Sequence, residues 1–410
     1  MIILMWLVLL FPQFQSSSGL IFEQILSMLL VSIIFVFIMV TKGLFKRIHI
    51  FFIVFYMILI VISIIRGVFD NFIFKDIFEL SKPLYLGSFF LLSYSINWDK
   101  DNLKYFIKHF CYAMGVICLF GIFESTTEVG NTIAHTLYKD MRGGVQYKAV
   151  ASFISPYVFA SVLLIPTFIY YTRWFATFRI ENLLATFFFL TGTILTQSRT
   201  VFLSLIITMI LFYLYSIFSS HYVGRNKHVY VMSIVGGVCV LSLPLLVLLI
   251  ENNFKYLYSG LEVLYLNIVD FHFMSLIYST PSISHRYEQI VFVLENIDLL
   301  PIVGVGIGKA VLMPESFYAL YLYRVGIVGI IIHFSLIVFS FVFCRKLSIN
   351  YRDDKIIHCF FVSIQMYLIS LPFSYASSAL NDQVRSGFIF YIIIGLIFKM
   401  FDTIKEKKCS

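Results

Sequence analysis

The sequence predicts an all-α, polytopic integral membrane protein. Hydrophobic residues make up 60% of the 410 residues and charged residues only 13%, and the apolar residues form repeated runs close to bilayer-spanning length. The period-2 alternation of membrane β-strands is absent from these runs. Because the bilayer core holds no water to satisfy backbone groups, the runs are predicted to be helices.

Polar breaks between the apolar runs divide the chain into twelve predicted spans. Three of them, at residues 2–14, 83–96 and 183–196, are short for a bilayer, which needs roughly 20 residues per helix. The others cover residues 20–40, 48–65, 103–123, 149–171, 201–218, 229–250, 317–343, 356–373 and 388–401. The chain is therefore expected to place nine spans in residues 1–250, a long and partly helical loop in 251–315, and three spans and a tail in 316–410.

The distribution of lysine and arginine predicts the orientation of these spans. Eighteen of the 30 basic residues fall on one side, in segments 42–47, 100–108, 173–179, 225–227, 345–355 and 399–408. The side richer in Lys and Arg is typically cytoplasmic. Both termini are then cytoplasmic, and the long loop lies on the outer face. The formal net charge of +8 is a signal for insertion and for contact with membrane lipids, and no nucleic-acid partner is expected.

Cysteine and glycine patterns exclude several kinds of site. All six cysteines lie in predicted spans or on the cytoplasmic side, so no disulfide is expected. No C-x-x-C pair or outer His/Cys/Asp cluster occurs, so neither a metal nor a cofactor is expected. The segment 304–309, GVGIGK, departs from a phosphate loop in its glycine spacing and in the Ala310 that follows the lysine. A flexible turn before the tenth span is the better interpretation.

The cations predicted on the outer side include an unusual set of arginines. Arginine presents a planar fork that suits phosphate oxygens. Three of the set are placed at the N-termini of predicted helices, where the helix dipole opposes a cation unless an anion is bound. The full set is Arg66, Arg142, Arg199, Arg286, Arg324 and Arg385, of which Arg199, Arg286 and Arg385 open helices.

For Arg286, the sequence also predicts the direction of the side chain. It opens a helix predicted for residues 284–296 in the long loop, and it shares one face with the apolar stripe Ile290, Val293, Leu294 and Ile297. The side chain is therefore expected to point toward the protein or the membrane. An anionic ligand would satisfy it there, and so would an ion pair with an acid such as Glu288, Glu315 or Asp382.

Motifs in the second half of the chain resemble those of the O-antigen polymerase and ligase superfamily. Residues 197–203, QSRTVFL, resemble its S-R-x-x-x-L turn, and Arg286 through Gly308 resemble its R-x-x-x-W/Q…P-x-x-G-x-G stretch. Residues 315–318, ESFY, with the later 326–329, GIVG, resemble its H/D-N-x-Y-L…G-x-x-G entry into the next span. The resemblance covers residues 197–329 in motifs and the whole chain in topology.

The resemblance implies a GT-C-like, metal-independent glycosyltransferase. Such an enzyme polymerises undecaprenyl diphosphate-linked oligosaccharides at the periplasmic face of the bacterial inner membrane, with a chain-length regulator and a flippase as further partners. It also implies Arg199 and Arg286 as stabilisers of the leaving diphosphate, and Glu315 as the base or as a carboxylate that positions the acceptor. Diphosphate and substrate contacts are then expected from Arg142, Arg385, His285, Tyr287 and Arg324.

Some of these expectations have alternatives. Arg324 ranks below the other arginines because a straight helix would carry it about 13 Å deeper than Glu315 and onto roughly the opposite face. The loop 124–148, with Glu124 and Arg142, supplies sugar contacts or forms a solvated cap. An O-antigen ligase is the nearest alternative function, although Glu315 stands where the ligase branch has histidine. A lipid-linked oligosaccharide flippase is disfavoured because the two halves show no self-similarity.

Overall fold

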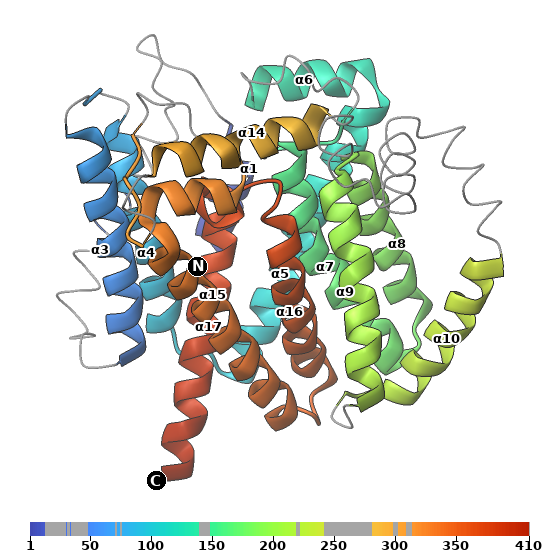
Figure 1. Cartoon of the computed structure of the whole chain (residues 1–410). Coiled ribbons are helices and arrows are strands. Elements are labelled where there is room, and N and C mark those ends of the chain that lie inside the picture. Colours follow the sequence, from blue (N-terminus) through green and yellow to red (C-terminus); the bar gives the residue numbers. More distant parts are fainter. Residues whose placement is uncertain are drawn as a thin grey trace.

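Long helices run side by side along one axis, and shorter ones cross over one end (Figure 1). In this computed structural model the described residues are 1–12, 30, 33, 48–69, 72–73, 76–138, 148–218, 222–241, 281–297, 302–308 and 314–409. All regular structure within these residues is helical. The predicted all-α class is therefore confirmed for this part of the chain.

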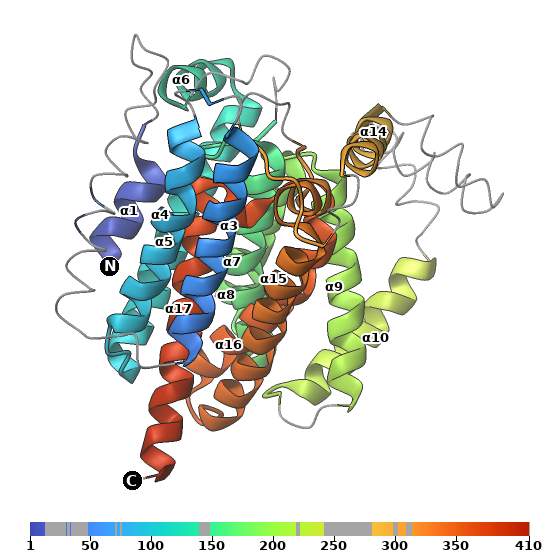
Figure 2. The same cartoon turned by 60° about the vertical axis from the view of Figure 1, so that its left-hand side comes forward.

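The long helices alternate in direction, which defines two ends of the bundle (Figures 1 and 2). We call the end at which every second helix begins the loop end, and these helices are α4 (Asp76–Ser95), α7 (Pro156–Thr177), α9 (Arg199–Phe218), α15 (Phe317–Asn350) and α17 (Val384–Cys409). The opposite, lysine-rich end is where α3 (Ile48–Val68), α5 (Lys100–Thr126), α8 (Ile180–Leu195), α10 (Arg225–Leu241) and α16 (Lys355–Ser374) begin.

Short elements complete the loop end. They are α1 (Ile2–Leu10), α6 (Glu128–Tyr138), α14 (Pro281–Asn296) and the 3-10 turn η2 (Leu380–Asp382). Figure 1 shows α6 and α14 lying across the tops of the long helices. The described basic residues predicted to be cytoplasmic all lie at or near the lysine-rich end. The charge segregation used to predict orientation is therefore present, while the identity of the cytoplasmic side stays a prediction.

Seven described helices are long and apolar enough to cross a membrane, namely α3, α5, α7, α9, α15, α16 and α17. This number is consistent with a polytopic membrane protein. Of the other predicted spans, α1 has nine residues, α8 has 16 and α10 has 17. Helix α4 carries three charged residues in its first two turns, and residues 20–40 lie largely outside the described part. The total of twelve spans and the GT-C-like fold stay predictions.

The two largest errors in the predicted helix starts, of seven residues each, are at α7 and α4, and side-chain contacts explain both. Helix α7 begins at Pro156 and not at residue 149, because Ser155 accepts a hydrogen bond from the Val158 N–H as an N-cap and proline suits the first helical turn. Helix α4 begins at Asp76 and not at residue 83. Its extra turns hold Glu79 and Lys82, whose charges are neutralised by partners in the fold.

Helix α15 is broken at Gly326, where the sequence predicts one continuous span. Gly326 has φ +67° and ψ −167°, a conformation that only glycine adopts readily. The turns before it lie across the loop end, and the rest of α15 descends through the bundle (Figures 1 and 2). The expected 13 Å descent from Glu315 to Arg324 is therefore wrong, because the chain travels sideways over these residues.

A buried histidine ties three long helices together beneath the loop end. The imidazole of His333 on α15 lies 3.0 Å from the Tyr56 hydroxyl on α3 and 2.9 Å from the Tyr375 hydroxyl that follows α16. Phe317 stacks on Tyr375 with ring centroids 4.4 Å apart. These contacts satisfy the polar atoms inside an apolar core, so this end of the bundle is firmly packed.

Candidate functional site

Helix α14 presents one buried face to the loop end. Gln289, Val293 and Ile297 are buried on this face, and Arg286 is half-buried one turn before Gln289. The prediction that Arg286 points inward is confirmed. Of the predicted stripe, Val293 and Ile297 pack against the protein, while Ile290 and Leu294 are exposed. The inward face therefore carries polar groups at its N-terminal half.

Arg286 reaches an aromatic ring and no acid in the described part of the chain. Its guanidinium carbon lies 5.5 Å from the ring centroid of Tyr157, in the first turn of α7, a cation–π contact. The Nε atom of Arg286 is buried and makes no hydrogen bond. Of the acids expected to pair with it, Glu288 accepts a hydrogen bond from Ser284 and Asp382 pairs with Arg324. The charge is thus desolvated on one side without a carboxylate to balance it.

Gln289 connects the segment before α15 to α14. Its Oε1 accepts a hydrogen bond from the Glu315 N–H at 2.9 Å, and its Nε2 lies 3.0 Å from Nε2 of His285. On the other side, the Glu315 carbonyl accepts a bond from the Ala379 N–H at 3.1 Å. The backbone of Glu315 is therefore fixed, while its side chain is exposed. The structure therefore places the Glu315 backbone against the helix that carries His285 and Arg286.

Arg199 is the first residue of α9, as predicted. The tight turn before it places Gln197 at φ +54°, and the Ser198 hydroxyl accepts a hydrogen bond from the Val201 N–H. Ala149 donates to the Leu195 carbonyl at 3.1 Å, so the chain entering α7 lies beside the chain entering α9. Because Arg286 contacts Tyr157 in the first turn of α7, Arg199 and Arg286 both lie near the start of that helix.

Glu124 fixes the backbone of the segment that leads into α7. Its buried carboxylate accepts hydrogen bonds from the N–H groups of Val150, at 2.9 Å, and Ala151, at 2.5 Å. Ala151 adopts φ +51° in this turn. The sequence left open whether the loop 124–148 contacts sugars or forms a solvated cap. Glu124 does neither in this structure, because it supports the backbone that leads into α7.

Arg324 is fully buried in a four-residue charge network. Its guanidinium nitrogens lie 3.0 Å from Glu79 and 2.9 Å from Asp382. Lys82 lies 2.8 Å from Glu79 and 3.5 Å from Asp382, which makes the network neutral overall. The network joins α4, α15 and η2. Sequence analysis missed Glu79 and Lys82, although their three-residue spacing on a helix places them on the same face.

Arg385 holds the end of α1. Its Nε donates to the Val8 carbonyl at 3.0 Å, a second nitrogen donates to the Phe11 carbonyl, and its guanidinium carbon lies 5.3 Å from the ring centroid of Tyr138. These carbonyls lie at the C-terminal end of a helix, where a cation is favoured. Two of the predicted substrate arginines, Arg324 and Arg385, thus have protein partners. Tyr287 is half-buried on α14, and Arg142 lies outside the described residues.

The glycine segment 302–308 forms a packed strap and not a flexible turn. Arg66 at the end of α3 donates to the carbonyls of Val303, at 3.2 Å, of Gly304 and of Val305, at 3.0 Å. Gly304 and Gly306 have φ of +69° and +89°. A Cβ atom at either position would overlap backbone atoms of α15 or α3. The strap is therefore wedged between α3 and the break in α15.

Neither a metal centre in the described part of the chain nor a similar protein points to the activity of the chain. Within the described ranges, no three His, Cys, Asp or Glu side chains lie close enough together to hold a metal ion. Comparison with family models, curated proteins and solved structures finds no match. Fold and composition define the class of the chain, a polytopic α-helical membrane protein.

Proposed function

We propose that this protein is a metal-independent glycosyltransferase that polymerises undecaprenyl diphosphate-linked oligosaccharides into O-antigen at the periplasmic face of the inner membrane. The observation that carries the proposal is Arg286. Its guanidinium sits half-buried at the loop end, against Tyr157, with no acid beside it in the described residues. A polyprenyl diphosphate would supply the missing negative charge at the depth of the membrane surface.

The reaction requires charge stabilisation more than it requires covalent help from the protein. A sugar hydroxyl of the incoming unit attacks the anomeric carbon of the growing chain, and the bond from that carbon to the diphosphate oxygen breaks. The electron pair leaves with the polyprenyl diphosphate, and Arg286 and Arg199 stabilise its charge. The hydroxyl proton passes to a base, for which the exposed carboxylate of Glu315 is our candidate.

The contacts of the other predicted arginines refine this scheme. Arg324 and Arg385 are engaged with carboxylates and helix carbonyls, so we assign them positioning roles. The Gln289 bond to Glu315 keeps the candidate base beside the helix that carries Arg286. Twelve spans, cytoplasmic termini and a GT-C-like fold belong to the proposal.

The test is the surface lipopolysaccharide made by cells that carry single variants. Arg286→Ala and Arg199→Ala should insert normally but yield lipopolysaccharide with one repeat unit, because losing one stabilising donor costs about 10²–10³ in rate. Arg286→Lys should restore little, because a lysine lacks the bidentate fork. The matched control is Arg179→Ala, which removes an exposed arginine at the lysine-rich end. A normal ladder from both alanine variants would contradict the arginine assignment.

Deletion of the whole gene separates the nearest alternative. Loss of a polymerase leaves cores that carry a single repeat, whereas loss of a ligase leaves cores that carry none. A deletion strain whose cores lack any repeat would therefore replace polymerase with ligase. The same gel, probed with antibody against the protein, confirms that each variant is present in the membrane.

A further inference from the structure

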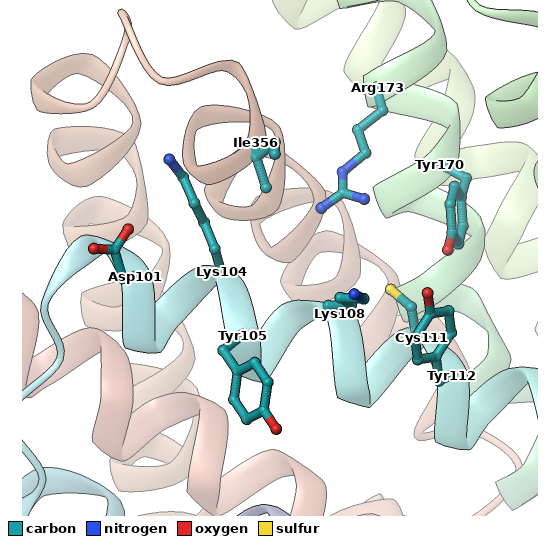
Figure 3. Close-up of a pocket in the computed structure, with 9 residues that line it drawn as sticks. All are labelled: Asp101, Lys104, Tyr105, Lys108, Cys111, Tyr112, Tyr170, Arg173 and Ile356. Atoms are coloured by element: carbon teal, nitrogen blue, oxygen red, sulfur yellow. The ribbon is translucent and has the colours of Figure 1, made fainter.

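A cavity at the lysine-rich end lies between α5, α7 and α16, far from the site described above. It has a volume of about 520 Å³, within the range of small-molecule sites. Figure 3 shows its lining side chains, of which Lys104, Lys108 and Arg173 carry positive charge. The remaining lining residues are Asp101, Tyr105, Cys111, Tyr112, Tyr170 and Ile356.

Two of the three cations have no acid partner in the described residues. Lys108 lies 5.7 Å from the ring centroid of Tyr112, and the guanidinium carbon of Arg173 lies 5.8 Å from that of Tyr170. The Nε atom of Arg173 is buried and makes no hydrogen bond. In Figure 3 the Arg173 guanidinium hangs from α7 into the gap above Lys108 on α5. Positive charge is therefore concentrated at this part of the cavity.

The acids near the cavity are gathered around the third cation. Lys104 forms an ion pair with Asp354, with 2.6 Å between nitrogen and oxygen. Asp101 lies one turn before Lys104, at the opposite end of the row from Arg173 (Figure 3). Basic residues at this end are expected from membrane topology alone. Topology does not require that Lys108 and Arg173, from two different helices, converge on one cavity.

The shape of the cavity favours a lipid over a free ion. Its lining runs along α5 from Asp101 to Tyr112, about 16 Å along the helix axis, from the polar end of the helix toward its apolar middle. Three of its lining residues, Tyr105, Tyr112 and Ile356, are exposed. Exposed tyrosines beside cations are typical of the depth at which lipid headgroups meet acyl chains. A phosphate placed between Lys108 and Arg173 would have its chains leave past these side chains.

We propose that this cavity binds the phosphate of an anionic membrane phospholipid, with Arg173 and Lys108 as its ligands. Arg173 supplies a fork of N–H donors, and Lys108 supplies a point charge. Lys104 and Asp354 form the polar wall. The proposal is independent of the reaction assigned to the loop end, because it concerns the opposite end of the bundle.

Native mass spectrometry of the purified full-length protein in detergent tests the proposal. Phosphatidylglycerol should bind, and its Kd should rise about 10-fold in Lys108→Gln and in Arg173→Gln, because each variant removes one charge-assisted contact. The matched control is Arg179→Gln, which removes an exposed arginine at the same end and should leave the Kd unchanged. Lys108 is itself exposed, so its substitution leaves the packing intact.

Each other outcome overturns the proposal or its lipid source. Equal affinity for phosphatidylcholine, whose choline balances the same phosphate charge, shows that the cavity does not select an anionic lipid. Unchanged phosphatidylglycerol affinity in both Gln variants shows that Lys108 and Arg173 do not bind its phosphate. Displacement of phosphatidylglycerol by inorganic phosphate at equal concentration assigns the cavity to a free anion. If Arg173→Gln fails to fold, Lys108→Gln alone decides between these results.

Discussion

Removal of the Arg324 side chain is the sharpest test of the buried charge network. In the folded protein its guanidinium is 0% exposed and lies 3.0 Å from Glu79 and 2.9 Å from Asp382. Arg324→Gln leaves these two carboxylates with Lys82 as their single cation. The network then carries one uncompensated negative charge on buried carboxylates.

The expected cost follows from what buried ion pairs do when one partner is lost. Such a deletion costs about 3–5 kcal/mol, which is a large share of a total stability of about 5–15 kcal/mol. For a chain of 410 residues, whose unfolding entropy is about 2.1 cal/mol/K per residue, this corresponds to a fall in Tm of about 3–6 °C. Arg324→Lys should cost less, because it retains the charge and loses only the fork.

The assay is thermal unfolding of the purified protein in detergent, followed by tryptophan fluorescence. The decisive variant is Arg324→Gln with Asp382→Asn, which restores neutrality because Glu79 and Lys82 then remain as a pair. We expect the double variant to be more stable than Arg324→Gln alone by about 1–3 kcal/mol. The control is Arg352→Gln, an exposed arginine at the lysine-rich end. An unchanged Tm in Arg324→Gln, or strictly additive losses in the double variant, would refute the reasoning.

Three further predictions test other parts of the structure. Gly306→Ala should lower the free energy of unfolding by about 1–3 kcal/mol through backbone strain at φ +89°, and overlap of the new Cβ with the Ser63 carbonyl adds to this loss. A Tm equal to that of the wild type would contradict the close packing of the strap against α3. Arg385→Gln should speed proteolytic cleavage next to α1, because Arg385 donates hydrogen bonds to the last carbonyls of that helix. Equal cleavage rates in the variant and the wild type would show that these bonds do not hold α1 in place. Burial raises the pKa of Asp354, but hydrogen bonds from Lys104 and from backbone N–H groups of α16 outweigh it, so this pKa stays below its ordinary value of 3.8. The ionised Asp354 therefore stabilises the folded protein above pH 3.8, and this stabilisation is lost as the pH falls through the lower pKa of the folded state. In Asp354→Asn, the Tm should fall less on acidification than in the wild type.

The helices that the sequence predicted well are those whose signals are local. Helices α5 and α16 begin where an aspartate caps the first turn, at Asp99 and Asp354, and a continuous apolar run follows each cap. The start of α4 was misplaced because Glu79 and Lys82 were treated as a polar break. Their partners, Arg324 and Asp382, are more than 240 residues away in sequence, so no local pattern reveals that these charges can be buried.

The candidate site was predicted in its helix positions but not in its partners. Arg199 is the first residue of α9, as expected from the turn before it. The expectation that Arg286 opens its helix is wrong, because α14 begins at Pro281 and not at residue 284, which places Arg286 in the second turn. The sequence could not show that Arg385 would be held by α1, because that contact joins opposite ends of the chain. The break at Gly326 was hidden for the same reason, since glycine within an apolar run is common and the strap that requires it comes from residues 302–308.

The strap and its neighbours hold α14 at defined points along its length. Its C-terminal half is moored, because the strap that follows is wedged against α3 and because Phe292 packs on Tyr323 with centroids 5.8 Å apart. Nearer its N-terminal end, Gln289 bonds to the backbone of Glu315. Arg286 lies six residues before Phe292, about 9 Å along the helix axis, so a tilt of about 10° about that point moves its Cα by about 1.6 Å. The position of this arginine is therefore fixed by two contacts on its own half of the helix, the Gln289 bond to Glu315 and its own contact with Tyr157.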